Sequence, residues 1–260
     1  MKLISRRNLL TQSIRMAGPG TIGLPLVGAA ANRSTAGPPD EKRKLKVVVA
    51  GGHPDDPESG CGGTIARYTN LGHEVVVIYL TRGEAGIEGK SHAEAAATRT
   101  AEALKACEIL KARPVFAGQV DGRTEVSPAR YTDFRKLLEA ERPDLAFTHW
   151  PIDTHPDHRT ISLLVYDAWL RGGKKYPLYY FEVMSGSQTQ QFWPTHFVDI
   201  TLTEPRKRAA CFAHESQNPA EWYALHDKMN RFRGMESGHR YAEAFVRHVQ
   251  SPEVASPLAF

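Results

Sequence analysis

The sequence predicts an α/β fold in which helices cover both faces of a mostly parallel β-sheet, giving three layers. Short segments rich in β-branched residues, such as 44–50 and 74–81, have the composition of strands that are buried on both faces. Segments with apolar residues every three to four positions, such as 93–112, separate these strands. Strands and helices alternate from residue 44 to residue 171, which is the pattern of successive βαβ units.

The expected elements follow from local signals along the chain. The first strand, 44–50, ends at Gly51-Gly52 and therefore opens into a loop, and a helix at 64–70 stops at Leu71-Gly72-His73 before the second strand. Further strands are expected at 114–117, 145–150, 179–184 and 197–201, and further helices at 129–141, 159–171, 204–213 and 220–232. Without an internal repeat or a low-complexity segment, these elements predict one Rossmann-like three-layer sandwich.

The first 40 residues differ from the rest of the chain. Adjacent Arg6 and Arg7 precede a weakly apolar stretch that carries no charge from Met16 to Asn32 and ends in small residues. This composition is typical of a signal peptide, and the paired arginines indicate the twin-arginine export route. Interrupting glycines and prolines argue against a stable membrane anchor, so we expect a periplasmic or extracellular protein. A basic tail without a targeting role is the alternative.

Composition limits the classes of partner. The formal net charge of +4 arises partly from the first 44 residues, and no basic stripe remains beyond them to bind nucleic acid. The three cysteines have unrelated spacings and form no CxxC pair, so small buried side chains are expected rather than a disulfide framework.

Two similar motifs, His53-Pro54-Asp55-Asp56 and His155-Pro156-Asp157-His158, each follow a predicted strand. Loops at the carboxyl ends of parallel strands line the ligand crevice of an open sheet, so both motifs are expected at one edge. Either motif alone also fits a turn in which proline fixes φ and aspartate caps the next helix. The coincidence of two such motifs favours a shared site.

The residue types in these motifs fit a catalytic metal centre. His53, Asp56 and His158 would provide two imidazoles and one carboxylate for zinc, which leaves a position open for water. Zinc lowers the pKa of its water to about 7, and that water would attack an amide carbonyl. Asp55 is then free as the general base, and His155 as a proton donor or electrostatic helper. The same ligands accept Fe²⁺ or Co²⁺.

These motifs resemble those of the PIG-L/LmbE-like family of zinc-dependent de-N-acetylases. The resemblance extends over most of the chain after the leader, and further blocks carry it: residues 80–86, Arg99 with Glu102, and residues 214–217 after Lys207. It implies one zinc ion per chain on His53, Asp56 and His158, with Asp55 as base and His155 as helper. Pro57 departs from the pattern, because many members have glutamate directly after the two aspartates.

The resemblance also implies a domain and a substrate class. Residues 41–250 would form the deacetylase domain, after a signal peptide and linker at 1–40 and before a tail at 251–260. The expected reaction removes acetyl from an N-acetylglucosamine-like sugar or glycan, and an exported enzyme would meet extracellular glycans or scavenged amino sugars. The alternatives are an amidase for a larger acyl amide or conjugate, and a non-catalytic periplasmic sugar- or metal-binding protein. A homo-oligomer is left open.

Other polar and aromatic residues have two interpretations each. Arg99 matches a family arginine near the substrate, but also fits a surface arginine paired with Glu102 or Glu94. Asp121 either contacts substrate or belongs to a plain turn, and His214 either faces the site or satisfies a helix end. The late aromatic residues either stack on sugar faces or pack in the core: Phe192, Trp193, Trp222 and Tyr223. The remaining histidines are expected to be structural: His73, His92, His149, His196, His226, His239 and His248.

Overall fold

A computed structural model describes residues 43–253. The predicted signal peptide and linker at 1–40 and most of the predicted tail, residues 254–260, lie outside this range. Among the helices at residues 43–253, none is long and apolar enough to cross a membrane.

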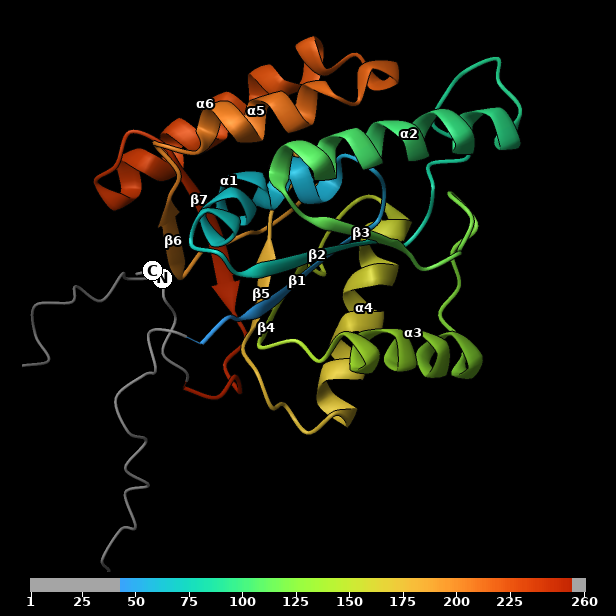
Figure 1. The fold of residues 1–260 in the computed structure, drawn as a ribbon, viewed down its shortest axis with the longest axis horizontal. Coiled ribbons are helices and arrows are strands. Elements are labelled where there is room, and N and C mark those ends of the chain that lie inside the picture. The colour runs from blue at the N-terminus through green and yellow to red at the C-terminus, as the bar shows by residue number, and fades with distance from the viewer. Residues whose placement is uncertain (1–42, 254–260) are drawn as a thin grey trace, which may run out of the picture. The chain divides into compact units, whose positions relative to one another are not determined.

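Within the described range, seven strands form a sheet in the order β3-β2-β1-β4-β5-β7-β6 (Figure 1). Strands β1 to β5 run parallel, whereas β7 is antiparallel to both of its neighbours, β5 and β6. The strands are β1 (Lys46–Gly51), β2 (Glu74–Tyr79), β3 (Arg113–Phe116), β4 (Leu145–His149), β5 (Leu178–Phe181), β6 (His196–Asp199) and β7 (Ala242–Arg247). The expected mostly parallel α/β sheet is confirmed.

Helices cover both faces of this sheet (Figure 1). They are α1 (Asp56–Asn70), α2 (His92–Leu110), α3 (Pro128–Glu141), α4 (Pro156–Arg171), α5 (Glu204–Phe212) and α6 (Pro219–Ser237), with a short 3₁₀ helix η1 (Glu215–Gln217). Helices α1, α2, α5 and α6 lie on one side, and α3 and α4 lie on the other. The three layers follow from this arrangement.

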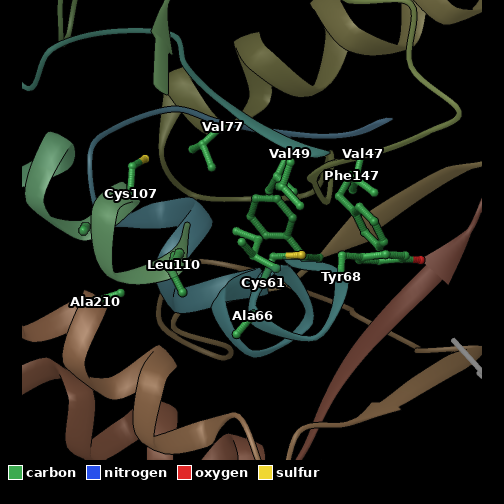
Figure 2. Close-up of a cluster of buried hydrophobic side chains, with 14 of the residues drawn as sticks. Val47, Val49, Cys61, Ala66, Tyr68, Val77, Cys107, Leu110, Phe147 and Ala210 are labelled. Atoms are coloured by element: carbon green, nitrogen blue, oxygen red, sulfur yellow. The ribbon is translucent and has the colours of Figure 1, made fainter. Parts of the chain in front are cut away.

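Alternate residues of the central strands supply two cores. Val47 and Val49 of β1 point toward α1 and α2, where they pack with Cys61 and Leu110 (Figure 2). Val48, between them, joins the second core under α3 and α4. Because side chains alternate across a strand, a strand buried on both faces must be apolar at every position, which explains its continuous valine run. All three cysteines are buried and unpaired, as expected.

Helix α1 begins eight positions earlier than the sequence indicates. Its first half contains Gly60, Gly62 and Gly63, which disfavour a helix by propensity. A Cβ at Gly60 would lie 2.4 Å from the Phe181 ring, and one at Gly63 would lie 2.6 Å from Ile200. Close packing against β5 and the segment after β6 therefore requires glycine here, and tertiary contacts override the local preference.

Strand β7 was not expected from the sequence. It contains Glu243, a buried carboxylate between apolar neighbours, which obscures the pattern of a buried strand. Glu243 accepts hydrogen bonds from Lys207 Nζ at 2.7 Å and from the Gly63 and Thr64 amides at 2.9 and 2.8 Å. Its partners lie on α5 and α1, so only the folded chain explains how this strand is buried.

Candidate metal centre and active site

Neighbouring strands bring the two histidine motifs together. Strand β1 pairs in parallel with β4, so the loops that follow them leave the sheet at the same edge. The ring of His53 lies 4.6 Å from that of His155 and 5.3 Å from that of His158, measured between centroids. The predicted meeting of residues about a hundred positions apart is therefore confirmed.

The first motif turns sharply into α1. Asp55, at the helix N-cap, has φ 108°, which is strained for a residue other than glycine. Its amide donates to Glu58 Oε2 at 3.2 Å, and the His53 amide donates to Asp56 Oδ2 at 2.8 Å. The Asp55 carboxylate pairs with Arg99, whereas the Asp56 carboxylate lies against His53, so the two adjacent carboxylates can take different roles.

Both ring nitrogens of His53 lie within hydrogen-bond distance of carboxylates. Its Nδ1 lies 3.1 Å from Asp56 Oδ2, while its Nε2 lies 3.0 Å from Asp157 Oδ2 and 3.2 Å from Asp121 Oδ1. Burial lowers the pKa of His53, but hydrogen bonds with Asp121, Asp157 and Asp56 outweigh it and hold the pKa well above its usual value. A cation at Nδ1 would replace the proton there, with Nε2–H still donating to a carboxylate.

His158 shows the same arrangement from the other motif. Its Nε2 lies 3.2 Å from Asp56 Oδ2, and its Nδ1 lies 3.1 Å from Asp153 Oδ1. Burial lowers the pKa of His158, but Asp56 and Asp153 raise it more, to about 9. Asp153 is itself fixed, since it accepts from Thr189 Oγ1 at 3.0 Å and from the His155 amide at 2.8 Å.

Three overlapping groups of side chains could hold a metal ion among the described residues. One contains His53, His155 and His158, another contains Asp56, His149 and His158, and the third contains His53, Asp121, His155 and Asp157. The predicted ligands His53, Asp56 and His158 are divided between the first two groups. A cluster that could bind a metal is present, and the choice of these three as its ligands stays a prediction.

Arg99 reaches the candidate base. The Arg99 side chain is buried, its Nη2 lies 2.8 Å from Asp55 Oδ2, and it also donates to the Pro54 carbonyl. The alternative of a surface arginine paired with Glu102 or Glu94 is wrong. Burial raises the pKa of Asp55, the Arg99 charge lowers it and Asp56 raises it, with a value of about 6 as the result.

His155 and Asp121 also line the site. The Asp157 amide donates to His155 Nδ1 at 3.3 Å, so the neutral ring carries its proton on Nε2. Burial and the positive neighbours His53 and His158 lower the pKa of His155.

Asp121 is buried, and its Oδ2 accepts from the Ala85 amide at 3.2 Å. This bond joins the loop of Asp121 to the loop of Ala85, so Asp121 does more than form a turn.

One histidine of the site, His149, was missed in the sequence. His149, expected to be structural, ends β4 with its Nε2 3.4 Å from Asp56 Oδ2 and its ring stacked 4.1 Å from that of His158. Burial and the His158 charge lower its pKa to about 4. The sequence signal that could have placed His149 in the site is its position at the carboxyl end of a predicted strand. His214, for which the sequence left two interpretations, is buried with its Nε2 3.4 Å from Oε1 of Glu58 in the first turn of α1.

A cavity of about 480 Å³ opens onto this cluster. All seven predicted site residues line it: His53, Asp55, Asp56, Arg99, Asp121, His155 and His158. The cavity continues past them to residues of α6 and of the segment after β5. Its size suits a small ligand rather than a macromolecular interface.

Comparison with known proteins identifies the class. The model of the PIG-L family, described as GlcNAc-PI de-N-acetylase, matches residues 47–169. Diacetylchitobiose deacetylase of Thermococcus kodakarensis is 34% identical over 221 residues, which cover 76% of this chain and 81% of that protein. This protein belongs to the PIG-L family, a family of deacetylases and therefore of hydrolases.

Solved structures agree on the fold. N,N'-diacetylchitobiose deacetylase from Pyrococcus horikoshii has a TM-score of 0.70 and 27% identity, covering 80% of this chain and 85% of that one. A 4-carboxy-2-hydroxymuconate hydratase from Pseudomonas putida KT2440 has a TM-score of 0.68 at 23% identity, covering 83% of this chain and 100% of that one. The latter likeness shows the fold alone, so the reaction must be argued from the site.

Proposed function

We propose that this protein removes the N-acetyl group from an N-acetylglucosamine-like sugar or glycan and depends on a zinc ion held by His53, Asp56 and His158. The observation that carries the proposal is Asp55, a carboxylate in the cavity wall beside this cluster, with a pKa raised to about 6. A general base is most effective when its pKa is near the working pH. The similarity to diacetylchitobiose deacetylase supports the substrate class.

The donor set fits a divalent cation. Ligand atoms about 2.0–2.2 Å from a tetrahedral zinc ion are about 3.3 Å apart, close to the 3.1 and 3.2 Å that separate Asp56 Oδ2 from the two histidine nitrogens. The second ring nitrogen of each histidine is hydrogen-bonded to a carboxylate: His158 Nδ1 to Asp153 and His53 Nε2 to Asp157. Metal-bound histidines commonly have such carboxylate partners. When bound, such a cation acts as a Lewis acid and lowers the pKa of water.

The neighbouring residues then divide the work of amide hydrolysis. Asp55 takes a proton from the attacking water while the water oxygen forms a bond to the carbonyl carbon of the acetyl group. His155, neutral with its proton on Nε2, donates a hydrogen bond to the carbonyl oxygen as negative charge develops there. A neutral N–H is a weak acid, so the proton on Asp55 passes to the departing amine nitrogen as the C–N bond breaks. The products are acetate and the amino sugar.

The test uses protein stripped of metal and then titrated with Zn²⁺, Fe²⁺ or Co²⁺. It is incubated with N-acetylglucosamine, diacetylchitobiose, longer oligosaccharides and sugars with longer N-acyl groups, and both the free acid and the free amine are measured. We expect acetate and amine in equal amounts, restored by zinc and absent with chelator. Asp133→Asn, an exposed carboxylate on α3, serves as the control for Asp55→Asn.

Either of two results would overturn the proposal. Full activity after complete removal of metal would exclude the metal centre. Release of longer acids with no release of acetate would replace the deacetylase by an amidase for larger acyl groups.

We also propose that residues 1–40 direct export by the twin-arginine route. The support is the sequence pattern of Arg6, Arg7 and the uncharged stretch after Met16. Fusing residues 1–40 to a reporter that functions only after export tests this proposal. Replacing both arginines by lysine should abolish reporter activity, and an unchanged signal would contradict it.

A further inference from the structure

Part of the active-site cavity has no role in the proposed chemistry. Beyond the metal cluster, it is lined by Val183, Met184, Gln188, Gln217, Trp222 and His226. The first three follow β5, and the last three belong to η1 and α6. These elements come from the last third of the described chain, whereas the candidate metal ligands precede it.

Trp222 presents a rigid aromatic surface at this wall. Its Nε1 donates to the Gln217 carbonyl at 3.1 Å, and its ring meets the His226 ring edge-on, 5.6 Å away at 85°. Gln217 is held in turn, because its Nε2 donates to the carbonyl of Gly86, another residue of the cavity lining, at 3.0 Å. Trp222 remains half-buried, although its polar atom is already satisfied. A fixed ring of this kind loses little entropy when a ligand packs on it.

His226, one helical turn further along α6, is buried but incompletely bonded. It is 2% exposed, and its Nδ1 has no hydrogen-bond partner among the described residues. Burial and the nearby Lys207 charge lower the pKa of His226 to about 3, so the ring is neutral and offers one donor and one acceptor. The Nδ1 atom is closed to the cavity, but the ring lines it and Nε2 also makes no hydrogen bond with the described residues, so Nε2 is the atom that a ligand hydroxyl can meet.

Gln188 provides a further free polar group. Its backbone is anchored, since its amide donates to the Met184 carbonyl at 2.8 Å and its carbonyl accepts from Thr154 at 3.0 Å. Its half-buried side-chain carboxamide, however, makes no hydrogen bond with the described residues. This carboxamide can both donate to and accept from a ligand hydroxyl.

Together these groups define a ligand chemistry. The wall combines a flat apolar ring with a neutral imidazole and a carboxamide, and none of the three carries charge. An anionic group at this wall would require a cation beside it, and Arg99, the arginine that lines the cavity, is already paired with Asp55. A long acyl chain would leave the imidazole and the carboxamide unsatisfied. A neutral ring with an apolar face and a rim of hydroxyl groups satisfies all three.

We propose that Trp222, His226 and Gln188 bind the sugar ring next to the acetamide, with the ring face on Trp222 and its hydroxyl groups on His226 and Gln188. This inference rests on the proposed function and assigns the residues that would make the enzyme specific for sugars. Trp222 and His226 were among the residues with open or structural interpretations in the sequence.

The test compares substrates with and without a ring. Zinc-loaded Trp222→Ala and Trp222→Phe are assayed on diacetylchitobiose and on N-acetylethanolamine, which has the amide but no sugar. Trp193→Ala is the matched control, because Trp193 is 80% exposed and outside this cavity. For Trp222→Ala we expect kcat/KM on the sugar to fall about tenfold or more, as for loss of a packed aromatic surface. We expect little change on N-acetylethanolamine and partial rescue by phenylalanine.

A binding experiment separates this inference from the proposed function. Metal-free protein is titrated with chitobiose, the deacetylated product, by calorimetry, and binding should weaken in Trp222→Ala, His226→Ala and Gln188→Ala but not in Trp193→Ala. A wild-type protein that binds the sugar in this way but releases no acetate would overturn the proposed function and leave this inference standing. Sugar deacetylation that is equal in Trp222→Ala and Trp193→Ala, or lost equally on both substrates, would overturn this inference alone.

Discussion

Nη2 of Arg99 lies 2.8 Å from Oδ2 of Asp55 and links the middle of α2 to the turn that begins α1. Gly83 and Gly86 leave room for this contact, because a Cβ at either position would lie 2.4 or 2.5 Å from Arg99 Nη1. The pair joins a buried cation to a carboxylate whose pKa burial has raised. Arg99 therefore influences when Asp55 can accept a proton.

Arg99→Gln should move the acid side of the pH–activity profile upward. Burial raises the pKa of Asp55 to about 6 and the Arg99 charge opposes that rise, so loss of the charge should raise the pKa further. Asp55 acts as a base only when ionised, and kcat/KM should then fall off at a higher pH than in the wild type. The profile is measured from pH 5 to 9, with Arg130→Gln, an exposed arginine, as the control. An acid limb that stays in place or moves downward would contradict this role.

Asp55→Asn should reduce kcat by about 10²- to 10⁴-fold, the usual contribution of a general base. An amide has a similar shape but cannot take a proton from water. Zinc content, measured by atomic emission, should remain that of the wild type, because Asp55 is outside the proposed ligand set. Asp56→Asn provides the contrast, and it should lose both zinc and activity. Equal loss of zinc in both variants would show that Asp55 is a ligand instead.

Asp153→Asn should weaken zinc binding by about 10- to 100-fold, the usual effect of removing a carboxylate behind a metal-bound histidine. Asp153 Oδ1 lies 3.1 Å from His158 Nδ1 and so fixes which nitrogen of the ring faces Asp56. Zinc affinity is measured by competition with a chromogenic chelator. Asp167→Asn is the control, because Asp167 pairs with the exposed Arg171 at the C-terminal end of α4. Unchanged zinc affinity in Asp153→Asn would show that Asp153 does not support metal binding through His158.

Lys207→Met should destabilise the protein by about 3–5 kcal/mol, because it leaves the carboxylate of Glu243 buried without its partner. Lys207 and Glu243 are fully or almost fully buried, and their charged atoms are 2.7 Å apart. Unfolding in urea gives the free energy, with Lys105→Met as the control for an exposed lysine. The double variant Lys207→Met/Glu243→Gln should recover part of the loss. A single variant as stable as the control would show that the pair is not needed.

Most of the fold could be predicted because its signals are local. The valine-rich strands β1 and β2 are buried on both faces, and no alternation was needed to recognise them. The two exceptions depend on distant contacts. The glycines in α1 and the buried Glu243 in β7 oppose local rules, and they are accommodated by residues from distant elements: Phe181 and Ile200 for the glycines, and Lys207 and the Gly63 amide for Glu243.

The candidate site divides in the same way. The sequence alone determined that His53, Asp55, Asp56, His155 and His158 meet, because motifs that follow parallel strands share one edge of the sheet. Only the tertiary structure decided that Arg99 pairs with Asp55, that His149 faces Asp56, and that Trp222 and His226 line the same cavity. Residue types and spacing along one chain segment specify local geometry. Pairing, burial and pKa depend on side chains that come close only when the layers pack together.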